Sequence, residues 1–206
     1  SGQVRGTPVG VNPVLADMNG DGRDEVMMTS WVNPDFTNPE QVSGFQIFDP
    51  HGIRIAGTPI EWTGYGGEIA ETYHAYAPEL TPAVVDVNGD GTLEVITPGT
   101  DKRMHFFQWE GVQFVERNGW PKSLGDAMAA EPVVGDVDRD GQVDVVVTTF
   151  DHKKQNRGGH IIAWRLDGTL IFDQFVSGMN GFKGPAALGD IDQDGNLEII
   201  VSGEDG

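Results

Sequence analysis

The sequence contains no cysteine, so disulfides, thiolate metal sites and cysteine nucleophiles are excluded. It contains no Asn-x-Ser/Thr sequon, so glycosylation gives no indication of where the protein resides. No uninterrupted apolar run is longer than about four residues. We therefore expect neither a membrane-spanning helix nor the apolar core of a signal peptide.

Positive charge is also scarce, because 13 Lys and Arg residues face 32 Asp and Glu residues and the formal net charge is −19. Nucleic acids and anionic membranes require a basic surface, so we expect neither nucleic-acid binding nor membrane insertion. The chain is rich in glycine, with 29 residues, and 38% of its residues are hydrophobic. This composition is typical of a folded, turn-rich protein and not of a disordered one.

Four acidic segments align without gaps on the pattern D-x-[DN]-x-D-G-x-x-[DE], at residues 17–25, 86–94, 136–144 and 190–198. Their first aspartates are 69, 50 and 54 residues apart. A short apolar run, often β-branched, precedes and follows each segment, which predicts strands. These runs show little alternation, so we expect strands that are buried on both faces.

Two further apolar runs follow in three of the repeats, and tight turns such as Asp167-Gly168 join them into hairpins. Each unit therefore has four strands in about 50 residues, which is typical of a propeller blade. We predict an all-β fold in which residues 1–206 form one β-propeller segment of about 3.5–4 four-stranded blades. The repeats span approximately residues 11–63, 80–120, 130–176 and 184–206, and the last is incomplete.

The oxygen-bearing residues at alternate positions of each acidic segment predict a hard-cation site. Positions 1, 3, 5 and 9 offer side-chain oxygens, position 7 offers a backbone carbonyl, and glycine at position 6 permits a sharp turn. Such shells suit Ca²⁺ better than Mg²⁺, so we expect up to four Ca²⁺ ions, with weaker binding where Asn19 and Asn88 replace an aspartate. The expected ligands are Asp17, Asn19, Asp21, Arg23, Glu25, Asp86, Asn88, Asp90, Thr92, Glu94, Asp136, Asp138, Asp140, Gln142, Asp144, Asp190, Asp192, Asp194, Asn196 and Glu198.

Two other interpretations of these segments were considered. An EF-hand requires Glu at position 12, but Met28, Thr97, Val147 and Val201 stand there. An acidic, solvated turn without metal remains the alternative, although four aligned copies argue against it.

These segments and their flanking runs resemble the FG-GAP/VCBS repeats of integrin-α-type β-propellers across nearly the whole chain. The resemblance implies that each acidic loop joins the first two strands of a blade and that a calcium ion staples it. It does not imply one function, because such propellers serve as adhesins, lectin-like modules, accessory domains of hydrolases and scaffolds of polysaccharide lyases. Propellers of the family usually have more blades, so we expect part of a larger propeller, with a closed four-bladed ring as the alternative.

The connections opposite the acidic loops are longer and more varied, as functional loops on a rigid scaffold often are. They contain seven of the 13 basic residues, including Lys102 and Lys122, together with several aromatic residues, including Trp120. The long loop at 64–80 is the preferred contact site for an acidic carbohydrate or a peptide. The basic segment at 151–157 is a second candidate, with a solvated loop tip as the alternative. The candidate ligand-binding residues are Tyr65, Tyr73, His74, Tyr76, His152, Lys153, Lys154 and Arg157.

The sequence contains no catalytic signature such as Gly-x-Ser-x-Gly or His-Glu-x-x-His. We therefore favour a non-catalytic, calcium-binding propeller module of a secreted or cell-surface protein, used for adhesion or for recognition of a carbohydrate or protein ligand. One alternative is the propeller part of a secreted polysaccharide lyase or hydrolase. Another is a structural or assembly domain, whose open sheet edges pair with another chain or with missing blades.

Overall fold

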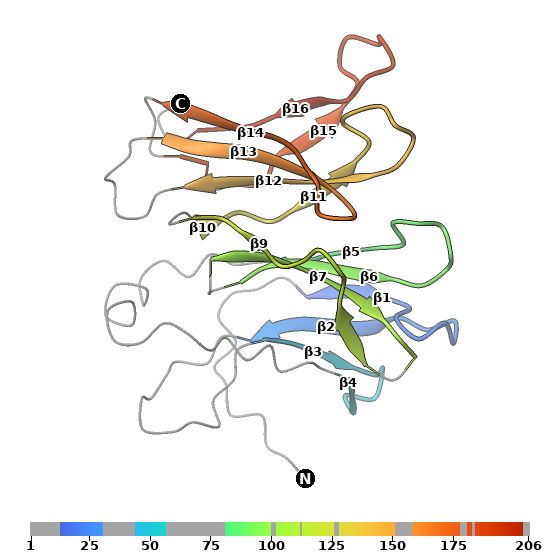
Figure 1. The fold of residues 1–206 in the computed structure, drawn as a ribbon. Coiled ribbons are helices and arrows are strands. Elements are labelled where there is room, and N and C mark those ends of the chain that lie inside the picture. The colour runs from blue at the N-terminus through green and yellow to red at the C-terminus, as the bar shows by residue number, and fades with distance from the viewer. Residues whose placement is uncertain are drawn as a thin grey trace, which may run out of the picture. The chain divides into compact units, whose positions relative to one another are not determined.

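The computed structural model describes residues 13–30, 44–56, 81–99, 102–111, 113–125, 128–150, 158–177, 181–182 and 184–203. Within these ranges every element of regular secondary structure is a strand, and the strands form four separate sheets (Figure 1). None of the described residues forms a helix long and apolar enough to cross a membrane. The predicted all-β fold class is thus confirmed.

The chain divides into two compact units, one of residues 1–81 and 109–115 and the other of residues 82–108 and 116–206. The first unit contains a four-stranded antiparallel sheet in chain order. Its strands are β1 (Val14–Ala16), β2 (Glu25–Ser30), β3 (Gly44–Phe48) and β4 (Arg54–Ala56). The Gly52 N–H donates to the Asp49 carbonyl at 2.9 Å and closes the predicted turn between β3 and β4.

Three further sheets follow along the chain. The second sheet has the order β5-β6-β7-β8, with β9 also paired to β7, and the third has the order β10-β12-β13-β14, with β11 also paired to β12. The last sheet pairs β15 with β16. The strands are β5 (Ala83–Val85), β6 (Glu94–Pro98), β7 (Arg103–Trp109), β8 (Phe114–Glu116), β9 (Lys122–Ser123), β10 (Met128–Ala129), β11 (Val133–Gly135), β12 (Asp144–Phe150), β13 (Gly158–Arg165), β14 (Leu170–Ser177), β15 (Ala187–Gly189) and β16 (Glu198–Ile200).

The strands that follow the second and third acidic loops, β6 and β12, form the interior of the second unit. Every residue of β6 and of β12 is buried, as the lack of alternation in their sequences predicts. β-Branched residues such as Val145, Val146 and Val147 suit this position, because both faces of the strand pack against apolar neighbours.

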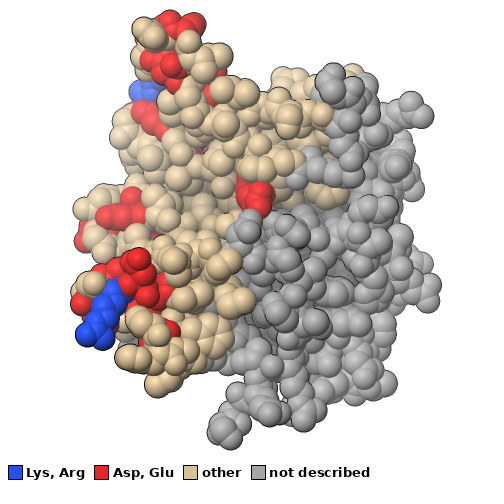
Figure 2. Space-filling view, turned by 180° about the vertical axis from the view of Figure 1, so that it is seen from behind, with Lys and Arg blue, Asp and Glu red and all other residues tan. Residues whose placement is uncertain are grey.

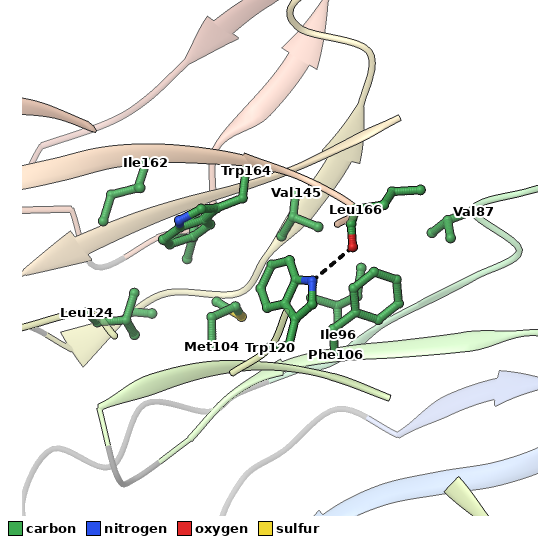
Figure 3. Close-up of a cluster of buried hydrophobic side chains, with 12 residues drawn as sticks. Val87, Ile96, Met104, Phe106, Trp120, Leu124, Val145, Ile162, Trp164 and Leu166 are labelled. Carbon is green, nitrogen blue, oxygen red and sulfur yellow. Dashed lines mark hydrogen bonds between the residues drawn. The ribbon is translucent and has the colours of Figure 1, made fainter. Parts of the chain in front are cut away.

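Tryptophans connect the second and third sheets inside the second unit (Figure 3). The Trp120 ring meets the Phe106 and Trp164 rings edge-on, with centroids 5.4 and 5.9 Å away, and its Nε1–H donates to the Leu166 carbonyl at 3.0 Å. Beside it, Gly119 has φ of +90° and approaches the turn of the β13–β14 hairpin so closely that a Cβ atom would lie 2.2 Å from the Asp167 carbonyl oxygen. Only glycine satisfies both conditions.

The third sheet contacts the fourth through β11 and β15, and it also bonds to the segment that precedes β15. The Thr148 Oγ1 hydroxyl donates to the Gly184 carbonyl at 2.8 Å, and the Phe182 N–H donates to the Thr149 carbonyl at 3.0 Å. The second unit is therefore a stack of sheets, as expected of neighbouring blades. No pairing among the described strands closes a ring, so the propeller and its number of blades remain predictions.

Candidate metal centres in the acidic loops

Each acidic loop joins two paired antiparallel strands: β1–β2, β5–β6, β11–β12 and β15–β16. In the third sheet, β10 precedes this pair and also pairs with β12. The position-9 residue opens the second strand and pairs with the last residue of the first strand, as Glu94 pairs with Val85 and Asp144 with Gly135. In the second unit the three loops project from the same side of the stack (Figure 1). Carboxylates gather on that side of the surface (Figure 2).

Every loop is closed by the same side-chain to backbone hydrogen bonds. The position-1 aspartate accepts the N–H of position 5 with Oδ1 and that of position 6 with Oδ2; for Asp136 these bonds are 3.2 and 2.9 Å long. Position 3 accepts the position-5 N–H, and position 5 accepts the position-7 N–H. Asp17, Asp86 and Asp190 make the same pair of position-1 bonds.

The curl depends on glycine at position 6. Gly22, Gly91, Gly141 and Gly195 have φ between +83° and +88°, where side chains with a Cβ are strained. The three short aspartate or asparagine side chains can reach the backbone only because the chain turns sharply here. The repeated D-x-[DN]-x-D-G pattern therefore encodes one loop conformation.

The position-9 carboxylate has a structural role that the sequence did not reveal. In each loop one of its oxygens accepts the position-2 N–H, at 2.8–3.0 Å, and thereby ties the start of the loop to the second strand. Glu25, Glu94 and Asp144 are at most 1% exposed, whereas Glu198 is partly exposed. Three of the four carboxylates are thus buried at the base of their loops.

The second oxygen of two of these carboxylates has no partner. Glu94 Oε1 and Asp144 Oδ1 are buried and accept no hydrogen bond, whereas Glu25 Oε1 accepts the Asn19 Nδ2–H at 3.2 Å. Burial raises the pKa of Glu94 and of Asp144 above the ordinary values. A buried carboxylate oxygen without a partner is unfavourable, and a bound cation would satisfy it.

In the third and fourth loops, three of the expected ligand carboxylates converge. One oxygen each from Asp136, Asp138 and Asp144 lies within 4.8 Å of the others, and the same holds for Asp190, Asp192 and Asp194. Together with the unpartnered buried oxygens, this donor set fits a hard cation such as Ca²⁺. The position-7 residues, Arg23, Thr92, Gln142 and Asn196, also lie in the loops, and their N–H groups donate to position 5.

The structure describes only a few residues of the predicted recognition surface, among them Trp120 and Lys102. Tyr65, Tyr73, His74, Tyr76, His152, Lys153, Lys154 and Arg157 lie outside the described residues. The interpretation of Trp120 and Lys102 as loop surface is wrong, since they are 8% and 5% exposed. Trp120 is drawn into the core because its ring packs on Phe106 and Trp164 while its N–H finds the Leu166 carbonyl.

A family model described as FG-GAP-like repeat matches the sequence twice, over residues 86–147 and 136–201, which together are more than half of the chain. The chain belongs to the FG-GAP-like repeat family. The matched residues of this FG-GAP-like repeat protein include its second, third and fourth acidic loops. The resemblance stated from the sequence motif is confirmed.

Comparison with curated proteins found no match for this FG-GAP-like repeat chain. Among solved structures, one similar chain is the crystal structure of the V. cholerae biofilm matrix protein Bap1, at 15% identity with a TM-score of 0.41. The likeness covers 85% of this chain and 30% of that chain, so this chain spans less than a third of that protein.

Proposed function

We propose that this chain is a non-catalytic segment of a calcium-stapled β-propeller, from an extracellular or cell-surface protein that recognises a carbohydrate or a protein. The observation that carries the proposal is the same closed loop, four times over, and in the second and third loops a buried carboxylate oxygen at the base lacks a partner. Family membership supports the propeller, and extracellular calcium concentrations suit exposed multi-carboxylate sites.

Ion binding would act mainly on stability. The loops collect carboxylates that repel one another, and Ca²⁺ bound to the folded loops but not to the unfolded chain adds its binding free energy to that of folding. The stapled blades would then present the opposite connections, at 64–80 and 151–157, to a ligand. The calcium-bound scaffold would thus provide stability, and the variable loops would provide recognition.

The test is thermal unfolding with millimolar Ca²⁺, with millimolar Mg²⁺ and with a chelator. We expect Ca²⁺ to raise Tm by several degrees and Mg²⁺ to raise it much less. Bound ligand in excess stabilises the fold by RT ln(1 + [L]/Kd), and 1 kcal/mol corresponds to about 2–4 °C in a chain of this size. A cooperative transition at the same temperature in all three conditions would contradict the calcium sites.

A matched pair of variants tests the ligands by calorimetry. Asp194→Asn keeps the Oδ1 atom that accepts the Asn196 N–H but replaces Oδ2, so we expect the number of bound ions to fall by one. Asp167→Asn, in the turn between β13 and β14, removes a carboxylate outside the acidic loops and should leave the number unchanged. Equal stoichiometry in both variants would exclude Asp194 as a ligand.

Recognition is tested separately, with calcium present. Arrays of acidic oligosaccharides and of peptides should reveal binding that weakens when Lys153 and Lys154 are both changed to Ala. Turnover of an acidic polysaccharide would instead favour the enzyme alternative, and concentration-dependent self-association without ligand binding would favour the assembly domain.

A further inference from the structure

The third acidic loop already holds a positive charge supplied by the chain itself. The Arg165 guanidinium, at the end of β13, donates from Nε to Asp138 Oδ2 at 2.8 Å, and its Nη2 lies 2.5 Å from the same oxygen. Nε also lies 3.5 Å from Asp140 Oδ2. Arg165 therefore contacts the outer oxygens of positions 3 and 5, which the loop's own backbone bonds leave free.

The register of β13 on β12 places this arginine at the loop. Arg165 pairs with Asp144, the position-9 residue. In the second sheet the corresponding partner of Glu94 is the uncharged Gln108. In the first sheet Asp49 stands there, directly after Phe48, and its Oδ1 accepts two N–H groups of its own turn.

Arg117, whose charge favours the ionised forms of Asp90 and Glu94 in the second loop, is placed differently. Arg117 lies over the Phe106 ring, with its guanidinium carbon 5.0 Å from the centroid, and its buried Nη1 has no hydrogen-bond partner. A direct guanidinium–carboxylate contact inside an acidic loop is thus, among the described residues, a feature of the third loop.

We propose that Arg165 is a built-in counter-cation that competes with calcium for the third acidic loop. It neutralises Asp138 and Asp140 when no ion is bound, and it lowers the calcium affinity of a loop that has four carboxylates. This inference rests on the proposed calcium binding and adds to it a residue that sets how strongly one site depends on the ion.

The geometry makes the two cations alternatives. Asp138 Oδ2 is within hydrogen-bond distance of the guanidinium, and the ion would need oxygens of the same cluster of Asp136, Asp138 and Asp144. Two positive groups on one carboxylate repel each other, so the ion must displace the guanidinium or bind more weakly beside it. Displacement is feasible, because the Arg165 side chain is 47% exposed and has room to move to solvent.

Arg165 does not satisfy the buried side of the third loop. Asp144 Oδ1 has no hydrogen-bond partner even with Arg165 in place. Arg165 therefore satisfies the exposed half of the loop only, and calcium remains the group that can satisfy both halves. We therefore expect Arg165 to weaken calcium binding at the third loop without preventing it.

Two variants with the same change of charge separate contact from general electrostatics. Arg165→Gln removes the contact and installs the residue type found opposite Glu94. Arg139→Gln, at position 4 of the same loop, removes an exposed charge. The Arg139 backbone has φ of +67°, and Gln193 adopts φ of +64° at the same position of the fourth loop. Both variants therefore copy residues that this fold already uses.

The measurement is a Ca²⁺ titration of the whole chain followed by NMR at the Gly141 amide, with Gly91 and Gly195 as internal references, in low-salt buffer. We expect Arg165→Gln to bind Ca²⁺ at the third loop about tenfold more tightly than Arg139→Gln, a difference of about 1.4 kcal/mol. Added NaCl should shrink this difference. Equal affinities in the two variants, with calcium bound, would overturn the inference and leave the calcium function standing.

A second measurement, in chelator, does not depend on calcium binding. Without the counter-cation, Arg165→Gln should unfold at a lower temperature than Arg139→Gln, and calcium should restore more of the lost stability in Arg165→Gln. Equal melting temperatures in chelator would exclude the neutralising role. If the native chain binds no calcium at any loop, the proposed function fails and the competition fails with it, whatever the chelator result.

Discussion

At the scale of single residues, the position-9 carboxylates combine two tasks that usually conflict. One oxygen of Glu94 or Asp144 ties the loop to its strand, and the other lies buried without a partner. Burial therefore disfavours the charged form of each group in the metal-free chain. Sequence alone assigned these residues as ligands, because the pattern shows the carboxylate but not the N–H that it accepts.

The raised pKa values of Glu94 and Asp144 predict the pH dependence of the metal-free protein. A carboxyl whose folded pKa exceeds its unfolded value stabilises the fold fully below the unfolded pKa, and this contribution is lost as pH rises through the folded pKa. Glu94→Gln and Asp144→Asn replace the carboxyl with an amide that does not titrate, so these variants do not lose stability in this way. In urea unfolding with chelator, the free energy of unfolding of each variant, relative to the native chain, should therefore rise as the pH increases above the ordinary carboxyl pKa of about 4.

Asp167→Asn is a control in which the pH dependence of the relative stability should have the opposite sign. Hydrogen bonds from Thr169 lower the pKa of Asp167, so its contribution is present above the unfolded pKa and is lost as pH falls through the folded pKa. Its relative stability should fall as pH rises. The same slope in all three variants would refute the assignment of raised pKa values to Glu94 and Asp144.

At the scale of elements, Trp120 connects the outer part of the second sheet to the hairpin of the third. Trp120→Phe removes the hydrogen bond to the buried Leu166 carbonyl as well as aromatic volume (Figure 3). Trp164→Phe removes similar buried volume without touching that bond. We expect Trp120→Phe to lower the free energy of unfolding by about 1 kcal/mol more than Trp164→Phe, measured in urea with Ca²⁺ present. A smaller loss in Trp120→Phe would show that the bond contributes nothing.

The elements themselves were largely predictable, because they depend on local patterns. The acidic segments, the Asp-Gly turn at residues 167–168 and the buried strand at 144–150 all follow from residues close together in the chain. Features that depend on how strands meet were not predictable. The contact of Arg165 with Asp138 needs the β12–β13 register, and the burial of Trp120 needs a partner 46 residues away. Neither leaves a periodic signal in the sequence.

At the scale of the whole molecule, the net charge of −19 makes the metal-free chain sensitive to ionic strength. Four bound Ca²⁺ ions would cancel eight of the nineteen formal negative charges. We therefore expect NaCl, raised to about 0.5 M, to increase Tm in chelator through screening, and to increase it less with Ca²⁺ present. A parallel titration with sucrose, which does not screen charge, controls for general solute effects. Identical salt dependence with and without Ca²⁺ would contradict relief of charge repulsion as the way in which calcium is proposed to stabilise the fold.

The closed hydrogen-bond pattern of the acidic loops also has a consequence for the speed and order of folding. All the backbone bonds accepted by a loop's position-1 and position-9 side chains lie within one nine-residue segment, as from Asp136 to Asp144. Closure of a segment of this size takes about 10–100 ns, far less than the pairing of distant strands. The two strands that flank each acidic loop can therefore find their register early and independently of the other sheets. The slow step is the formation of contacts between separate sheets, such as that of Trp120 with Leu166.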